Sequence, residues 1–258
     1  MILSSLPTLP DWLLPVAAAP FIGSLMGVMI RRLHDGRRIG LARSACDACG
    51  RSLRPQDLVP LLSFVGLRGR SACCAQKISW FYPIVELAAL AVAGWACLAT
   101  DAPWPGCVFG WTLLTLAWID LRSMLLPDVL TLPLLAAGLG LAALAGRDLL
   151  ADRAAAAALG FGLFESLALI YRRLRGREGL GMGDSKLLAA LGAWLGLAAL
   201  PLVMLLAACI GLAAVGGATL AGRRLAHDTA IPFGPCLAAS GWLIWLYGDE
   251  WLMWLGLG

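Results

Sequence analysis

Long apolar runs, separated by shorter polar segments, are the main pattern along the chain. A helix needs about 20 predominantly apolar residues to cross the hydrocarbon core of a bilayer. Runs of nearly that length or more, with at most one charged residue each, cover residues 12–30, 83–100, 102–119, 129–146, 154–171, 187–222 and 229–248. The run at 187–222 is too long for one span, and Gly196 and Pro201 mark a turn that divides it. The pattern therefore predicts about eight transmembrane helices.

Composition excludes a soluble fold. The chain is 60% hydrophobic and 14% charged, whereas soluble globular chains are about 25% charged. Its mean hydropathy is +0.81, so it has too little polar surface to cover a soluble domain. We expect an all-α polytopic membrane protein. Its one long polar segment, residues 31–82, predicts a small cytoplasmic, cysteine-containing lobe between the first and second transmembrane helices.

The distribution of Lys and Arg predicts the orientation in the membrane. With eight spans both termini lie on one side, and 18 of the 20 Lys and Arg residues fall in loops on the other side. Basic loops stay in the cytoplasm, so both termini are expected outside it. The formal charge of +4 is explained by this sorting and by contact with anionic lipid of the bilayer. No nucleic-acid partner is needed.

The polar lobe contains a candidate metal site. Cys46 and Cys49 form a CxxC pair, and Cys73 and Cys74 follow after a 23-residue gap, whereas Ser71 stands where a second CxxC pair would begin. A lobe of this size has too little core to fold unaided, and the cytosol disfavours disulfides. Two interpretations remain open, a structural zinc ion held by the four cysteines or reduced thiols without a metal.

Acidic residues within or beside apolar runs are candidates for function, because charges there are costly. They are Glu86, Asp120, Asp128, Glu165 and Asp184. The predicted topology places Asp120, Asp128 and Asp184 at the cytoplasmic boundary. Two close carboxylates share a proton, so one can take a proton from water while the other protonates a leaving amine. A pair formed by Asp120 and Asp184 predicts hydrolysis of an amide without a metal or covalent intermediate.

Structural roles compete with this interpretation. Asp128 is favoured as the N-cap of the helix that follows it. Asp184 could cap its helix in the same way, but the preceding glycines, Gly181 and Gly183, allow a close approach of backbone that a cap does not need. For Glu86, structural support through Lys77 or a neighbouring helix is favoured over catalysis. Glu165 is interpreted as a helix-packing or polar-network residue.

Asp120 is harder to explain by structure alone, since a carboxylate at a helix C-terminus opposes the helix dipole. Pairing with Arg122 is the structural alternative. If Asp120 ends one helix and Asp184 begins another, the two dipoles favour a shared proton on Asp120 and leave Asp184 as the initial base. Because the two carboxylates interact, the pKa values of such a pair describe the pair and cannot be assigned to one residue.

Several motifs occur in an order typical of one family. The most specific motif is GMGDSK at residues 181–186, and a second is Ile-Pro-Phe-Gly-Pro at 231–235. The remaining motifs lie at residues 23–24, 31–33, 46–49, 57–63, 69–70, 82–87, 119–122 and 126–131. With these motifs the chain resembles the bacterial type IV prepilin peptidases, bifunctional leader peptidases and N-methyltransferases of the GxGD aspartyl class. The resemblance covers nearly the whole chain, and Ser71 departs from the second cysteine pair.

The resemblance implies Asp120 and Asp184 as the catalytic pair. It implies support of the substrate or active site by Gly181, Gly183, Lys186, Asp128 and Glu86. The substrate would be a prepilin or pseudopilin of a type IV pilus or type II secretion system, with a short basic leader cleaved after a glycine at the cytoplasmic face of the inner membrane. S-adenosylmethionine would then methylate the new amino group, whereas cleavage needs no cofactor. The implied domains are a first transmembrane helix (1–30), the cysteine-containing lobe (31–82), which the resemblance associates with methylation, and a transmembrane aspartyl peptidase domain (83–258).

Two other classes of function are kept as alternatives. A transporter or channel would use Asp120, Asp184 and Glu165 as a proton path, but it would tend to place its acidic residues near the bilayer midplane, and no inverted repeat is apparent. A scaffold for a secretion machine would use the lobe as a docking module. Replacement of either aspartate by Asn separates these alternatives from the peptidase, because only the peptidase would then leave its substrate uncut.

Overall fold

The computed structural model describes residues 10–34, 46, 48–100, 102–176, 181–222 and 231–254. In these ranges the regular structure is helical, apart from isolated β-bridge residues such as Arg70 and Lys77, which pair with each other. The chain forms two compact units, residues 1–111 and 112–258. The helix α4 (Pro103–Ser123) contributes residues to both. An all-helical, polytopic membrane protein is therefore confirmed.

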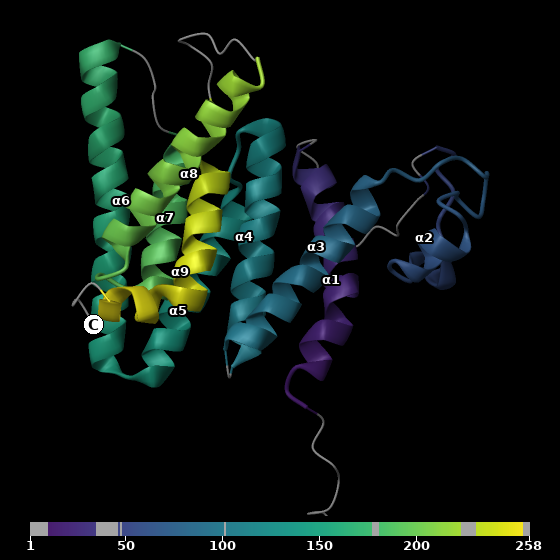
Figure 1. Ribbon diagram of the computed structural model, residues 1–258, viewed down its shortest axis with the longest axis horizontal. Coiled ribbons are helices and arrows are strands. Elements are labelled where there is room, and N and C mark those ends of the chain that lie inside the picture. Colours follow the sequence, from purple (N-terminus) through teal and green to yellow (C-terminus); the bar gives the residue numbers. More distant parts are fainter. Residues whose placement is uncertain are drawn as a thin grey trace, which may run out of the picture. The chain divides into compact units, whose positions relative to one another are not determined.

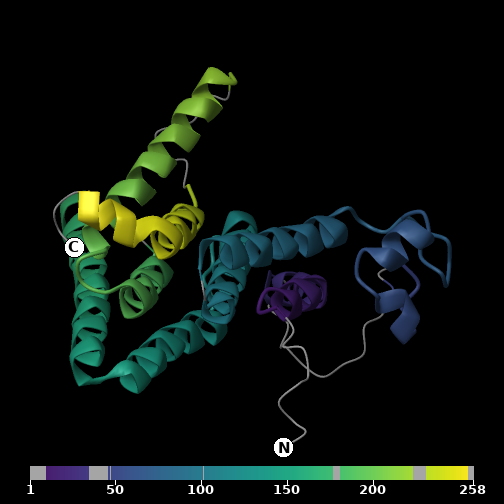
Figure 2. The ribbon, with the colours of Figure 1, turned by 60° about the horizontal axis from the view of Figure 1, so that its bottom comes forward.

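The first unit is built on a pair of packed helices, α1 (Leu13–His34) and α3 (Phe81–Ala99). Figure 2 shows α1 almost end on, with α3 passing beside it. Gly23 allows this close approach, since a Cβ atom there would lie 2.6 Å from the Cα atom of Glu86. Small residues at such a crossing let two helix backbones come together in a membrane, where lipid removes the hydrophobic driving force between helices.

The described part of the lobe between α1 and α3 has little core. It contains the 3₁₀ helix η1 (Pro55–Leu58) and the short helix α2 (Leu62–Gly66), and α2 has no buried residue. Phe64 of α2 packs edge to face against Trp80, with ring centroids 5.1 Å apart. Because these elements bury little apolar surface, we expect the lobe to need a further stabilising element, such as a bound metal ion.

The second unit is arranged around α7 (Met182–Leu195), which packs against α5 (Asp128–Ala145), α6 (Arg147–Arg175) and α9 (Gly234–Trp254). Figure 1 shows α7 between α6 and α9. The helix α8 (Leu200–Leu220) packs mainly on α9. Close packing depends on glycine here too, because a Cβ atom at Gly192 would lie 2.7 Å from the backbone of Ala156 on α6.

Each predicted span contains one helix, and the long run at 187–222 contains two. The predicted turn is confirmed, since α7 ends before Gly196, which has a φ of +87°, and α8 begins at Leu200 with Pro201 in its first turn. Five helices of the described part are long and apolar enough to span a membrane, namely α1, α3, α5, α6 and α8. Integral membrane character is thus clear, while the count of eight spans stays a prediction.

Candidate functional site

Asp120 lies in the last turn of α4 and is only 5% exposed. Its Oδ2 atom accepts a hydrogen bond of 3.0 Å from the backbone N–H of Gly234, the first residue of α9. The first N–H groups of a helix have no partner within the helix and carry partial positive charge. The start of α9 therefore holds the buried carboxylate at the end of α4.

The absence of a side chain at Gly234 is essential to this contact. A Cβ atom there would lie 2.6 Å from Oδ2 of Asp120, a separation that real Cβ atoms do not show. Sequence reasoning included Gly234 in a family motif but assigned it no role. The position lies 114 residues from Asp120, and a backbone donor leaves no signature in the side-chain pattern. Only the glycine itself, next to a helix start, could have indicated a close approach.

Asp184 lies in the first turn of α7 and is partly exposed. Its backbone N–H donates a 3.0 Å hydrogen bond to the carbonyl of Gly181, and its carboxylate lies close enough to Asp120 for the two charges to interact. The structure therefore brings together two carboxylates that are 64 positions apart in the sequence. Their catalytic roles stay a prediction.

The structure changes the argument about the shared proton. The dipole of α4 alone favours a proton on Asp120, but the N–H of Gly234 stabilises the ionised form of the same carboxylate. The two helix ends thus act in opposite directions on Asp120. Accordingly, we assign the shared proton to the pair and to neither member.

The two glycines before Asp184 differ in what they contribute. A Cβ atom at Gly183 would lie 2.8 Å from Cβ of Leu126, so the segment before α5 packs directly on the start of α7. At Gly181, the N-cap of α7, the nearest atom would be Oδ2 of Asp184 at 3.6 Å, an ordinary contact. The predicted need for close approach is therefore met at Gly183 and not at Gly181.

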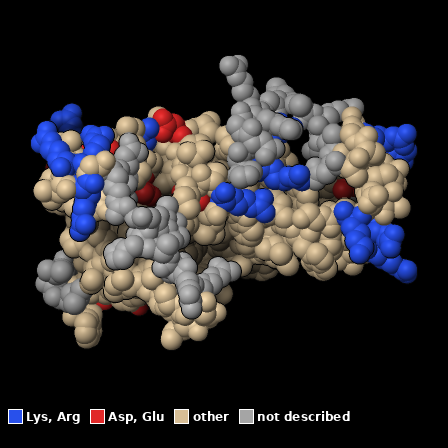
Figure 3. Space-filling model, turned by 90° about the horizontal axis from the view of Figure 1, so that it is seen from above, with Lys and Arg blue, Asp and Glu red and all other residues tan. Residues whose placement is uncertain are grey.

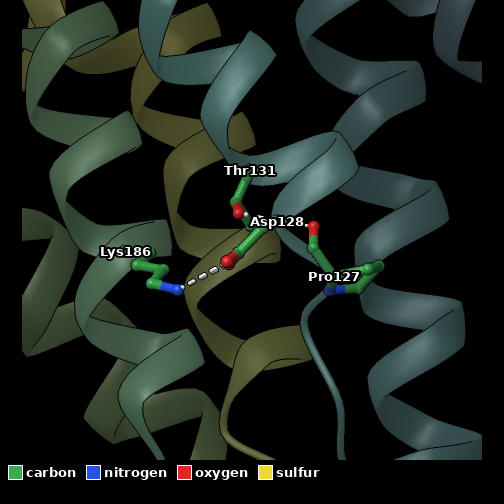
Figure 4. Close-up of polar contacts among 4 residues, drawn as sticks. All are labelled: Pro127, Asp128, Thr131 and Lys186. Carbon is green, nitrogen blue, oxygen red and sulfur yellow. Dashed lines mark hydrogen bonds and ion pairs between the residues drawn. The ribbon is translucent and has the colours of Figure 1, made fainter.

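Asp128 does not act as the N-cap of α5, so that interpretation is wrong. Pro127 occupies the N-cap position with an extended backbone, and Asp128 is the first helical residue. The Asp128 carboxylate instead binds Lys186 of α7, whose Nζ lies 2.6 Å from Oδ1 and 2.8 Å from Oδ2 (Figure 4). This pair ties the start of α5 to the helix that carries Asp184.

Two acidic candidates lie outside the aspartate pair. Glu86 belongs to the first unit, is 6% exposed, and accepts a 2.8 Å hydrogen bond from the backbone N–H of Leu61 through Oε2. It thereby fixes Leu61, which has a φ of +59°. Lys77 is not its partner. Glu165 is partly exposed on α6 and makes no hydrogen bond or ion pair with the other described residues.

The four cysteines of the lobe converge. Their sulfur atoms all lie within 4.8 Å of one another, with Cys46 and Cys74 at 3.7 Å and Cys49 and Cys73 at 3.3 Å. In a tetrahedral site with Zn–S bonds of about 2.3 Å, sulfurs lie about 3.8 Å apart. The four thiols therefore fit a zinc ion by number, chemistry and spacing. The broken CxxC pair does not prevent this, because Cys73 contributes the fourth sulfur.

Ser71, which replaces the expected cysteine, lies beside this cluster. Its Oγ is 3.4 Å from Sγ of Cys46 and 3.0 Å from Sγ of Cys73. The hydrogen bond to Ser71, followed by the backbone N–H groups of Cys49 and Ala48, lowers the pKa of the Cys46 thiol to about 6. A low pKa favours the thiolate, the form that binds zinc. Sequence reasoning had no means to see that Ser71 remains next to the sulfurs.

The pKa of Cys49 moves the other way. The backbone N–H of Arg51 lowers it, but the hydrogen bond to Cys73 and the neighbouring thiols outweigh this and raise the pKa to about 11. Four crowded thiols cannot all ionise without a cation between them. A divalent metal would supply that charge and release the protons.

Comparisons with known proteins match two parts of the chain to family models. The family model described as type IV leader peptidase family matches residues 107–216, and the one described as bacterial peptidase A24 N-terminal domain matches residues 18–100. Three similar proteins are named prepilin leader peptidase/N-methyltransferase. That of Aeromonas hydrophila is 43% identical over 82% of this chain and 74% of its own length. Those of Pseudomonas aeruginosa strain PAO1 and Burkholderia pseudomallei strain 1026b are 39% and 43% identical, over 81% and 83% of this chain and 73% and 70% of their own lengths. No solved structure matches the chain at a significant level.

Proposed function

Because this chain belongs to the type IV leader peptidase family, we propose that it removes the leader of type IV prepilins or pseudopilins and methylates the new N-terminus. The observation that carries the peptidase part is the meeting of Asp120 and Asp184 in the second unit. One carboxylate is buried and held by a helix N-terminus, and the other is partly open to solvent. A pair of this kind is suited to acid-base catalysis on an amide.

The proposed cleavage proceeds without a covalent intermediate. The ionised member of the pair takes a proton from water while the oxygen of that water attacks the carbonyl carbon of the scissile bond. The protonated member donates to the carbonyl oxygen, and the tetrahedral intermediate then loses the amine, which leaves with a proton from the pair. The partly exposed Asp184 is the member that reaches water, and Gly234 keeps Asp120 in place throughout.

Lys186 and Asp128 would act as positioning residues. Their ion pair joins the starts of α5 and α7 beside Asp184. Gly183 supports the same junction through its contact with Leu126. None of these groups is assigned a proton transfer.

We place the site at the cytoplasmic face of the inner membrane, with both termini in the periplasm. Basic side chains support this orientation. Arg172, Arg173 and Arg175 occupy the last turn of α6, the element that precedes α7 and Asp184. Figure 3 views this end of the second unit and shows Lys and Arg gathered there. A periplasmic enzyme that folds only with disulfides, fused after Trp254, should therefore be active, and an inactive fusion would contradict the orientation.

The proposed second activity uses S-adenosylmethionine. When bound, S-adenosylmethionine would supply a methyl group to the new terminal amine, with S-adenosylhomocysteine and one proton as the other products. Support comes from the names of the relatives, which include N-methyltransferase. We further propose that Cys46, Cys49, Cys73 and Cys74 hold a zinc ion, which would cross-link a lobe that has little core of its own.

Intact-mass analysis of a co-expressed prepilin tests both activities at once. The wild-type enzyme should yield mature pilin that is heavier than the bare amine by one methylene group. Asp120→Asn and Asp184→Asn should leave the prepilin uncut. Glu165→Gln is the matched control, because it makes the same kind of change on α6 and should process normally. Wild-type amounts of mature pilin in both Asn variants would overturn the peptidase, and unmethylated mature pilin would overturn the transferase.

A further inference from the structure

The first unit contains a cavity of about 600 Å³. It lies among α1, α3 and the lobe, and its described walls include Arg31, Arg32, Phe64, Tyr82 and Glu86. Cavities of about 300–1,000 Å³ are typical of sites for small ligands. The aspartate pair belongs to the second unit, so this cavity is distinct from the proposed peptidase site.

One wall carries a buried acid. Glu86 is 94% buried and reaches the cavity, where it accepts hydrogen bonds from the Leu61 backbone and from Ser24. Among the described residues, no Lys or Arg forms an ion pair with it. A buried carboxylate is costly unless a positive charge offsets its loss of hydration. The acids Glu86 and Asp57 share this cavity with the bases Arg31, Arg32 and Lys77, so its walls offer both signs of charge to a ligand.

The wall supplied by α1 has the opposite charge. Arg31 donates a hydrogen bond to the hydroxyl of Tyr82, and its guanidinium lies over the Tyr82 ring, 5.6 Å from the centroid. Arg32 lines the same space. Guanidinium groups recognise carboxylates through paired N–H donors. A ligand that carries a carboxylate as well as a cation fits both walls.

Aromatic rings complete the set of groups. Phe64 and Tyr82 both line the cavity, and ring faces of this kind stack on planar heterocycles. A sulfonium and an ammonium, a carboxylate and a purine occur together in S-adenosylmethionine. We propose that this cavity is the S-adenosylmethionine site, an inference that rests on the proposed methyltransferase activity. In this arrangement Glu86 would bind the cationic part of the ligand, and Arg31 would bind its carboxylate. The rings of Phe64 and Tyr82 would stack on the adenine.

The test measures binding of radiolabelled S-adenosylmethionine to the purified full chain in nanodiscs by equilibrium dialysis. Glu86→Gln should weaken the affinity about tenfold or more, since a charged partner is lost. Ala48 offers a second variant that should fold normally, because this cavity residue is exposed. Ala48→Trp should weaken binding by filling space. Leu62→Trp is the control, as Leu62 is 73% exposed and lies outside the cavity wall.

The outcomes separate this inference from the proposed function. If wild-type chain binds S-adenosylmethionine and both cavity variants bind it equally well, the ligand sits elsewhere and the inference is wrong, while the transferase stands. If wild-type chain binds none and releases unmethylated pilin, the proposed transferase itself has failed. A prepilin leader peptide is added as competitor. Displacement of S-adenosylmethionine by that peptide would assign the cavity to the peptide and overturn the inference.

Discussion

The backbone N–H of Gly234 donates a 3.0 Å hydrogen bond to Oδ2 of Asp120, although 114 residues separate them. The contact joins the first residue of α9 to the last turn of α4. It fixes one oxygen of the carboxylate, and the proposed proton transfer uses the other. Any side chain at position 234 would occupy the place of that hydrogen bond.

Gly234→Ala should slow leader cleavage by about 100-fold while the chain stays folded. The added Cβ atom would lie 2.6 Å from Oδ2 of Asp120, so the carboxylate must move, and a displacement of about 1 Å can cost about 100-fold in rate. Cleavage of a purified prepilin, measured beside the thermal unfolding temperature, checks this. Gly216→Ala is the control, because a Cβ atom there meets nothing within 4 Å. Equal cleavage rates in both variants would contradict the positioning role.

The ion pair of Asp128 and Lys186 should matter more for rate than for stability. Lys186 is 25% exposed and Asp128 is 55% exposed, and pairs this open to solvent contribute about 0–1 kcal/mol to folding. Asp128→Asn and Lys186→Met should each slow cleavage by loosening the junction of α5 and α7. In a double-mutant cycle the combined variant should be no slower than the slower single variant. Fully additive losses of rate would show that the two residues act separately.

Much of the fold follows from hydrophobic periodicity, but the ends of helices do not. The helix α6 begins at Arg147, seven residues before the apolar run that predicted it. A hydropathy pattern detects only the part of a helix that avoids water, whereas backbone hydrogen bonds continue into polar residues such as Asp148. The turn between α7 and α8 was predictable because Gly196 and Pro201 act on the backbone directly.

At the site, sequence reasoning could predict that Asp120 and Asp184 meet, because topology alone places both at one boundary. It could not predict what holds them. The donor to Asp120 is a backbone group at Gly234, and Asp128 loses its expected capping role because Pro127 occupies the N-cap position. Contacts of this kind depend on tertiary packing between helices that are distant in the sequence.

The lobe should contain about one zinc ion per chain. Metal analysis of purified protein should show zinc in the wild type and its loss in Cys46→Ser and Cys73→Ser. Cys209→Ser on α8 is the control, since that thiol is exposed and outside the cluster. Zinc retained at wild-type content by Cys73→Ser would mean that Cys73 is not the fourth ligand. No zinc in the wild type would remove the metal site altogether.

Ser71→Ala should keep the zinc ion but hold it less tightly. The Ser71 hydroxyl lies 3.0 Å from Sγ of Cys73 and 3.4 Å from Sγ of Cys46, and it donates to thiolates when the metal is bound. Loss of such an outer partner typically weakens metal affinity about 10- to 100-fold. Competition with a chelator of known affinity measures the change. Ser79→Ala, another serine of the lobe with its hydroxyl on a backbone N–H rather than a sulfur, should leave zinc affinity unchanged.

Removal of zinc should also weaken binding of S-adenosylmethionine, because Cys46 and Ser71 line the proposed cofactor cavity as well as the metal cluster. The lobe has no buried residue in α2 that could hold this wall in place without the metal. Dialysis of the chain against a chelator, followed by the S-adenosylmethionine binding assay, should show the loss, and restored zinc should reverse it. Unchanged affinity in zinc-free protein would show that the cavity wall keeps its shape by other contacts. The cluster would then serve a purpose separate from the cofactor.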